Sequence, residues 1–207
     1  MPSSQSWYSV CYGNGKFVAM VYNSDTFAYS TDGITWTQST LPSSQSWWSV
    51  CYGNDKFVAI CINSDVFAYS TDGITWTKGN MPNTQAWSSV CYGNSKFVAV
   101  GYNSNIFASI TFTEISTPAS AYFVIDDTKL GQENYSISKN NMPSSQYWKS
   151  VCYGNGKFVA VAENTDTFAY STDGITWTQG NMPSSQSWWS VCYGNDKFVA
   201  ICINSDV

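Results

Sequence analysis

Short runs of aromatic and β-branched residues alternate with polar turns along the whole chain. This pattern is typical of β-strands, and no helical spacing of apolar residues competes with it. The dipeptides Asn14-Gly15 and Asp32-Gly33 fall between such runs, and each is a strong signal for a tight hairpin turn. The pattern therefore predicts four antiparallel strands in the first 40 residues, at 7–12, 17–22, 26–31 and 34–38, followed by a polar link over 39–45.

The same pattern recurs down the chain. A Met-Pro or Leu-Pro pair followed by a polar segment and a Trp begins at residues 1, 41, 81, 142 and 182. Residues 183–207 repeat residues 42–66 without a change. A unit of four antiparallel strands every 40 residues predicts a β-propeller, because a parallel β-helix has shorter rungs and a sandwich does not repeat so regularly.

The repeats predict one all-β domain, 1–207, with about five propeller blades. The expected blades are 1–40, 41–80, 81–141 with an insertion at 113–141, 142–181, and an incomplete last blade, 182–207. An incomplete blade leaves a bare strand edge near residues 198–203, and pairing of that edge with another copy predicts a homo-oligomer. The alternative is that the chain is a fragment of a longer repeat protein.

The composition narrows the possible chemistry. Only 11% of the residues are charged, the net charge is −5, and the chain contains neither His nor Arg. These absences exclude His-based triads, His-ligated zinc and arginine clamps for phosphate. A catalytic role for Glu163 needs a second carboxylate nearby, and the other two Glu of the chain, Glu114 and Glu133, lie in the insertion. We therefore expect a protein that is not an enzyme, has no cofactor or metal, and binds no nucleic acid.

The segment Ser30-Thr31-Asp32-Gly33-Ile34-Thr35-Trp36 recurs at 70–76 and 171–177. It resembles the Asp-box repeat of sialidase-like propellers from bacteria and phages, whose pattern is Ser-x-Asp-x-Gly-x-x-Trp, and is one residue shorter. The resemblance implies a structural hairpin at the blade periphery, braced by Asp32, Asp72 and Asp173. It also implies a role in surface recognition, on a virion or a cell surface. Sialidase activity is not implied, because those enzymes hold the substrate carboxylate with arginines.

One face of the predicted propeller collects Trp residues and Asn-Ser-Asp turns from every blade. Aromatic rings beside amide and carboxylate groups are suited to carbohydrate, so we expect a lectin-like binding module. Trp7, Trp47, Trp87, Trp148 and Trp188 recur unchanged and are expected in the core. The next position varies and is either tolerant surface or a ligand contact. The candidate binding residues are Tyr8, Trp48, Trp189, Asn23, Asp25, Asn63, Asp65, Asn164, Asp166, Asn204 and Asp206.

An alternative function is an assembly scaffold that docks protein partners. The insertion at 113–141 breaks the repeat symmetry, with strands expected at 121–125 and 134–138. It is either a decorated outer hairpin or a docking element. In the fourth repeat Lys149 and Glu163 replace residues of other types, which predicts an ion pair between neighbouring strands.

The N-terminus lacks the basic and apolar regions of a secretory signal, and no apolar run is long enough to span a membrane. We therefore expect synthesis in the cytoplasm. Five of the seven Cys recur at one repeat position, and we expect small, reduced core residues. A disulfide framework or a metal cluster is the alternative.

Overall fold

The computed structural model describes residues 1–113 and 134–203, and every regular element in them is a strand. The first two repeats form two four-stranded antiparallel sheets. Their strands are β1 (Trp7–Gly13), β2 (Lys16–Val21), β3 (Ser24–Ser30) and β4 (Thr37–Gln45), then β5 (Trp47–Gly53), β6 (Lys56–Cys61), β7 (Ser64–Ser70) and β8 (Thr77–Gln85).

The remaining strands join in one eight-stranded antiparallel sheet, because two long strands run from one repeat into the next. β12 pairs first with β11 and then with β13, and β15 pairs first with β14 and then with β16. The strands are β9 (Trp87–Gly93), β10 (Lys96–Gly101), β11 (Ser104–Thr113), β12 (Asn134–Gly154), β13 (Lys157–Glu163), β14 (Thr165–Ser171), β15 (Thr178–Gly194) and β16 (Lys197–Ile203).

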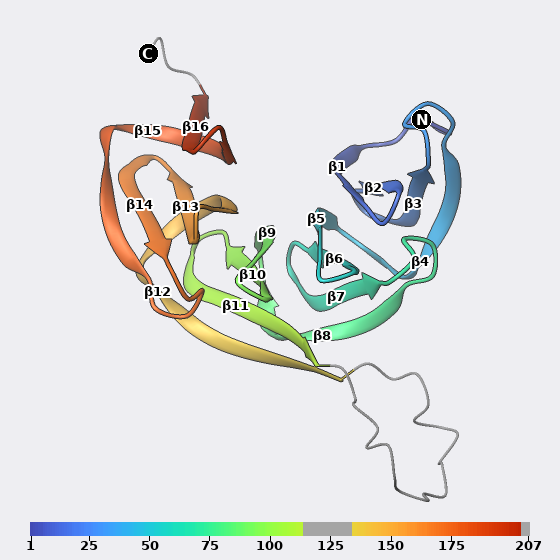
Figure 1. The fold of residues 1–207 in the computed structure, drawn as a ribbon, viewed down its shortest axis with the longest axis horizontal. Coiled ribbons are helices and arrows are strands. Elements are labelled where there is room, and N and C mark those ends of the chain that lie inside the picture. Colours follow the sequence, from blue (N-terminus) through green and yellow to red (C-terminus); the bar gives the residue numbers. More distant parts are fainter. Residues whose placement is uncertain (114–133, 204–207) are drawn as a thin grey trace, which may run out of the picture.

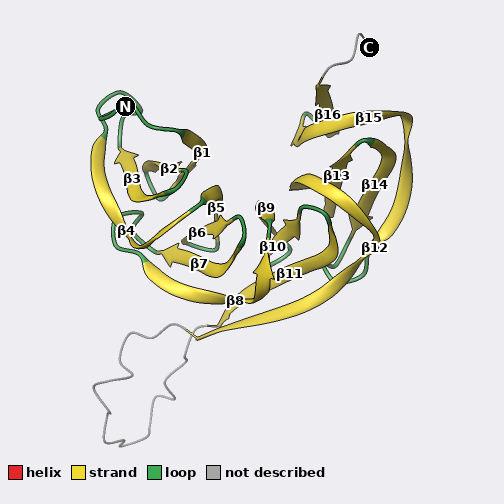
Figure 2. Cartoon of the chain, turned by 180° about the vertical axis from the view of Figure 1, so that it is seen from behind, coloured by secondary structure: helices red, strands yellow, loops and turns green. Residues whose placement is uncertain are grey.

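We name the repeats units 1 to 5 by their hairpins: β1–β4, β5–β8, β9–β11 with the start of β12, the end of β12 to the start of β15, and the end of β15 with β16. The units follow one another around an arc, with β1, β5 and β9 toward the centre and β4 and β8 on the outer rim (Figure 1). Units 1 and 5 stand at the two ends of the arc, as the view from behind also shows (Figure 2). The prediction of an all-β chain of repeated four-stranded sheets is confirmed.

The first hairpin of each unit turns as predicted. Asn14 and Gly15 both have positive φ, at 44° and 70°, and the corresponding pairs include Asn54-Asp55 and Asn94-Ser95. The third turn differs from the prediction. Only Gly33 of the Asp32-Gly33 pair has positive φ, and the chain turns up to Trp36, so the fourth strand begins at Thr37 rather than at residue 34. The expected link over 39–45 is therefore itself strand, as part of β4.

The core lies between the units, where each sheet packs on the next. Trp47 is fully buried against Val18 and Phe27 of the preceding unit, and Trp87, Trp148 and Trp188 repeat this role. The first strands also interlock: the Val50 N–H donates to Ser9 Oγ at 3.1 Å. A Cβ added to Gly13 would lie 2.0 Å from the ring of Tyr52, so a glycine is required there.

Unit 3 fills its interface in a different way. We name the repeated segments 30–36, 70–76 and 171–177, which begin with Ser and end with Trp, the boxes. Trp76 of the box in unit 2 packs against Phe27 and Phe57, but unit 3 carries no box in the described residues. Phe112 and Tyr135 stand in its place, and the Tyr135 ring lies 5.1 Å from that of Phe67. The strand expected at 134–138 is present at the start of β12, whereas the one expected at 121–125 lies outside the described residues.

Most of the cysteines lie in or against the core, as expected of small core residues, and Cys192 is the exception. Cys61 is buried, but Cys192 is exposed, and both carry free thiols, as do Cys11, Cys51, Cys91 and Cys152. Desolvation raises the pKa of Cys11 and Cys152 to about 12, which keeps these thiols protonated at neutral pH. Within the described residues, no helix is long and apolar enough to cross a membrane.

Candidate functional site

A β-bulge occurs at the same place in every unit, near the start of the first strand. Trp7 pairs with Val21 and Ser9 with Met20, so the residue between them, Tyr8, has no partner in the ladder. The corresponding bulged residues are Trp48, Ser88, Lys149 and Trp189. A bulge directs its extra side chain out of the regular alternation, and such bulges are common beside functional sites. The repeat position that varies in sequence is therefore the bulge.

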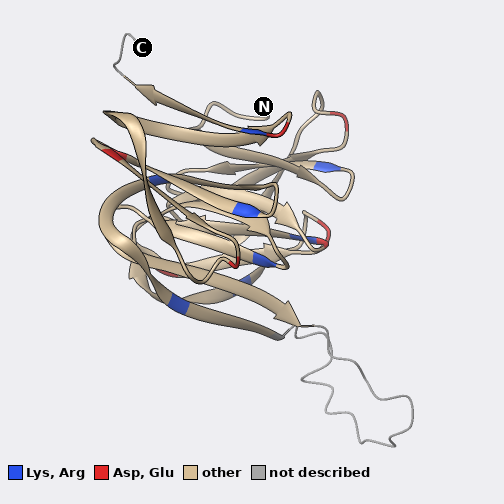
Figure 3. Ribbon diagram, turned by 60° about the vertical axis from the view of Figure 1, so that its left-hand side comes forward, with Lys and Arg blue, Asp and Glu red and all other residues tan. Residues whose placement is uncertain are grey.

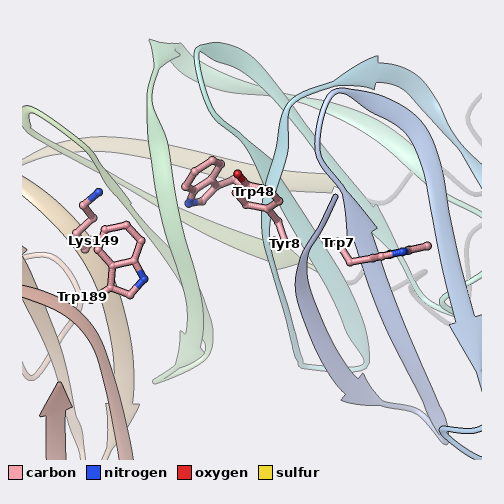
Figure 4. A pocket seen from close by; sticks show the side chains of 5 residues that line it. All are labelled: Trp7, Tyr8, Trp48, Lys149 and Trp189. Atoms are coloured by element: carbon pink, nitrogen blue, oxygen red, sulfur yellow. The ribbon is translucent and has the colours of Figure 1, made fainter. Parts of the chain in front are cut away.

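Four of these five side chains line one cavity at the inner end of the units. The cavity has a volume of about 380 Å³, and its walls are Trp7, Tyr8, Trp48, Lys149 and Trp189. Figure 4 shows Tyr8 and Trp48 together on one side and Lys149 and Trp189 together on the other. Three candidates from the sequence, Tyr8, Trp48 and Trp189, are thus brought to one site from units 1, 2 and 5.

The first wall is a cluster of three rings. The centroid of the Tyr8 ring lies 4.6 Å from that of Trp48 and 5.0 Å from that of Tyr22, and Tyr22 meets Trp48 edge-on at 5.8 Å. Rings held by one another lose little side-chain freedom when a ligand binds. Tyr8 nevertheless remains 49% exposed, so the cluster offers an apolar surface to a ligand.

The second wall holds a cation between aromatic rings. Lys149 Nζ lies 4.2 Å from the centroid of the Trp189 ring and 4.4 Å from that of Tyr102. It also forms the predicted ion pair, 3.0 Å from Glu163 Oε2, and the Tyr102 hydroxyl donates to the same oxygen at 3.4 Å. Desolvation and the nearby Glu163 carboxylate raise the pKa of Tyr102. The ion pair fixes Lys149 beside the exposed Trp189 and leaves this wall close to neutral.

Two members of the repeat pattern depart from expectation here. Trp7 was expected in the core, but it is partly exposed and lines the cavity, because unit 1 has no described unit packed against that face. Ser88 does not line the cavity: it is buried and donates to the carbonyls of Trp148, at 2.6 Å, and Val100, at 3.2 Å. Trp7 and Lys149 are therefore cavity residues that the candidate list from the sequence did not include.

The Asn-Ser-Asp residues are not among the residues that line this cavity. Asn23, Asn63 and Asn164 all have positive φ near 55°, as turn residues do. The Ser46 hydroxyl donates to Asn23 Oδ1, at 2.5 Å, and Ser187 makes the same bond to Asn164 at 2.8 Å. These side chains tie the turn to the following unit. Asp25, Asp65 and Asp166 are exposed at the turns, while Asn204 and Asp206 lie outside the described residues.

The box aspartates each hold a turn. Asp32 Oδ1 accepts from the backbone N–H groups of Ile34, at 2.8 Å, and Thr35, at 2.7 Å, and from the hydroxyl of Ser30. These bonds favour the charged carboxylate and lower the pKa of Asp32 to about 2. Asp72 and Asp173 make the same bonds in units 2 and 4.

Lys residues and acidic residues are few, and they are scattered along the described ribbon (Figure 3). No group of three or more His, Cys, Asp or Glu side chains that could hold a metal ion occurs within residues 1–113 and 134–203. What the cavity offers is therefore aromatic surface and one ammonium group, that of Lys149, which is paired with Glu163.

No protein-family model matches the sequence, and no curated protein matches it. Solved structures share its fold. A streptogramin B lyase superposes with a TM-score of 0.76 at 9% identity, covering 100% of this chain and 72% of the other. A virginiamycin B lyase from Staphylococcus aureus, with quinupristin, has a TM-score of 0.75 at 13% identity, covering 99% of this chain and 72% of the other. YCF48 bound to D1 peptide has a TM-score of 0.58 at 15% identity, covering 90% of this chain and 57% of the other. These neighbours are β-propellers, and this chain has the same repeat fold.

The comparisons correct one expectation, that the chain is not an enzyme. That inference rested on the absence of His and Arg and on the scarcity of Glu. Two of the structures with this fold are lyases, so a chain with this fold can be an enzyme. A missing residue type excludes only the mechanisms that need it, because function depends on the particular site and not on the fold. At 9–13% identity the likeness concerns the fold alone.

Proposed function

We propose that the chain binds a carbohydrate in the cavity formed by the bulged residues. The observation that carries this proposal is that the variable repeat position is a bulge in every unit and supplies four of the five cavity residues. The first strands lie toward the centre of the arc, so their bulges meet there, and the variation places a Tyr, two Trp and a Lys around one cavity. Convergence of different side chains on one cavity is what a single ligand with distinct contacts requires.

The chemistry of the walls suits a sugar. A pyranose ring has apolar C–H faces and polar hydroxyls at its rim, so it packs on an aromatic face while its edge forms hydrogen bonds. Tyr8 and Trp189 are 49% and 42% exposed, which leaves ring surface available on both walls. Lys149 supplies a hydrogen-bond donor next to Trp189. A volume of about 380 Å³ lies within the usual range of small-ligand sites, about 300–1,000 Å³, and is large enough for a short glycan.

The test is a glycan-array screen of the purified chain, followed by affinity measurements on Trp48→Ala and Trp189→Ala. Each substitution removes one aromatic ring from a wall of the cavity, so we expect binding at least about tenfold weaker in both. Thermal melting of the same samples checks that the fold is retained, because the two rings pack mainly on other cavity residues.

Tyr12→Ala is the matched control. Tyr12 is an exposed aromatic residue of the same strand as Tyr8, but it is not among the residues that line this cavity. Its removal should leave glycan affinity unchanged. The proposal fails if the folded chain binds no glycan, or if Tyr12→Ala weakens binding as much as Trp48→Ala does.

We also propose a number of blades for the propeller. Each unit would be one propeller blade, giving about five, with the fifth represented by its two inner strands. Four stacked interfaces support this count, each with the same Trp and the same hydrogen bond from a Val N–H to a Ser Oγ.

A further inference from the structure

Lys149 and Glu163 stand at two repeat positions that carry no charge in the other units. Their counterparts are Tyr, Trp or Ser at the position of Lys149, and Tyr or Ile at the position of Glu163. The two charges therefore occur together in unit 4, where Lys149 Nζ lies 3.0 Å from Glu163 Oε2. The positive charge of Lys149 comes with its own counter-charge.

Only one member of this pair faces the cavity. Among the described residues that line it, Lys149 is the only charged side chain, and Glu163 is not one of the lining residues. Lys149 Nζ lies 4.2 Å from the centroid of the Trp189 ring and 4.4 Å from that of Tyr102. Glu163 Oε2 also accepts a hydrogen bond from the Tyr102 hydroxyl, at 3.4 Å. The cavity therefore meets an ammonium group whose charge is already neutralised.

The surroundings of the pair strengthen its electrostatic effect. The side chains of Lys149 and Glu163 are only 16% and 18% exposed, so salt and water screen them less than they screen surface charges. A sugar carboxylate that entered the cavity would lose its hydration, and its attraction to Lys149 would be opposed by its repulsion from Glu163. A neutral sugar meets no such cost, because its hydroxyl oxygen accepts from a Lys149 N–H that Glu163 does not use.

We propose that the cavity selects neutral sugars over acidic ones and that Glu163 sets this selectivity by neutralising Lys149. The inference rests on the carbohydrate binding proposed above and names the class of sugar for the same cavity. A neutral pyranose would stack on Trp189 and accept a hydrogen bond from Lys149. Glu163 would act through Lys149, without contact with the sugar.

The test uses pairs of sugars that differ only at C6, where one carries a CH2OH group and the other a carboxylate. Glucose with glucuronic acid, and galactose with galacturonic acid, are such pairs, placed at the ends of otherwise identical glycans. The measured quantity is the ratio of the two affinities in each pair that binds, which cancels any general loss of binding. For the unaltered chain we expect the neutral member to bind at least about tenfold more tightly.

Glu163→Gln removes the carboxylate charge and keeps the size of the side chain. The charge of Lys149 is then unopposed, so the affinity ratio should shift toward the acidic sugar by at least about tenfold. Glu163→Tyr, which introduces the residue of units 1 and 3 at this position, should shift the ratio in the same direction. Melting curves identify the folded variants. An ion pair that only stabilised the fold would lower the melting temperature without changing the ratio.

Asp55→Asn is the matched control, because it changes the net charge of the chain by the same amount. Asp55 is exposed in the turn that follows β5, whereas the bulge at Trp48 lies at the start of that strand. Its φ is 55°, and Asn keeps the turn at such an angle. This variant should retain the affinity ratio of the unaltered chain.

These measurements separate the selectivity from the proposed function. If the folded chain binds no glycan at all, the proposed function fails and the selectivity fails with it. If glycans bind but the acidic member of a pair binds as tightly as the neutral one, only the selectivity is wrong. The same holds if the folded Glu163 variants leave the ratio unchanged, or if Asp55→Asn shifts it as much as they do.

Discussion

Units 2 and 5 have the same sequence from residues 42–66 and 183–207 but different surroundings. The face that packs on the preceding unit is alike in both, with Val50 and Val191 each 6% exposed. The face toward the following unit is not: Ile60 is completely buried against unit 3, whereas Ile201 is 59% exposed. Because the residues are identical, the difference comes entirely from the neighbours, as expected of repeats that bury apolar surface against one another.

The comparison is tested most strongly by Ile60→Ala and Ile201→Ala. Removal of the fully buried Ile60 side chain leaves a cavity between units 2 and 3 and should lower the free energy of unfolding by about 2–5 kcal/mol. Removal of the exposed Ile201 side chain should change it by less than about 0.5 kcal/mol. Urea denaturation of the two variants measures both values. A large loss for Ile201→Ala would mean that its face of β16 is covered in solution.

The second test compares Gly53→Ala with Gly194→Ala, and we expect a smaller difference in the free energy of unfolding than for the Ile variants. A Cβ on Gly53 would lie 2.1 Å from Cγ of Tyr92, so the ring must move, at a cost of about 1–3 kcal/mol. A Cβ on Gly194 meets nothing within 4 Å, and there the alanine also restricts the unfolded chain. Gly194→Ala should therefore be neutral or slightly stabilising in thermal melts. Equal destabilisation by the two variants would contradict the packing of Tyr92 on Gly53.

The parts of the fold that the sequence predicted are those set by local chemistry. Asn14-Gly15 forms a hairpin with both residues at positive φ, because these residue types tolerate that conformation. The recurrent Trp47, Trp87 and Trp148 are buried, because a large apolar side chain at a fixed place in every repeat packs between units. The start of the fourth strand was misplaced, since the bonds accepted by Asp32 hold residues 34–35 in the turn.

The candidate site was predicted only in part, because it depends on the bulge. Alternation along a strand predicts which side chains share a face, and one extra residue shifts that alternation without leaving a mark in the sequence. Variation among repeats still singled out Tyr8, Trp48 and Trp189. The sequence predicts Lys149 as an ion-pair partner of Glu163, and the structure confirms this pair, but the position of Lys149 beside Trp189 follows from the bulge. Trp7 differs from its counterparts only because of what surrounds unit 1.

The smallest expected effect is on the stability of the protein in acid. The units that carry a box should lose stability there through the box carboxylate, and the described part of unit 5 has no box. Hydrogen bonds from the backbone N–H groups of Thr176 and Ile175 lower the pKa of Asp173 to about 2. A pKa depressed in the folded state contributes stability above the unfolded value, about 3.9, and that contribution is lost as the pH falls toward 2. Asp173→Asn should therefore lower the melting temperature at pH 6 and flatten its fall between about pH 4 and pH 2.

Asp196→Asn provides the control from unit 5. Asp196 is an exposed turn residue whose carboxylate accepts from the Tyr193 hydroxyl, with no box around it. Asn at this positive φ keeps the turn conformation, so only the charge changes. Its melting temperature should fall with acid in parallel with that of the parent chain. If Asp173→Asn also ran parallel to the parent, the box carboxylate would not hold its turn more tightly as an anion, and the acid loss would have to come from other groups.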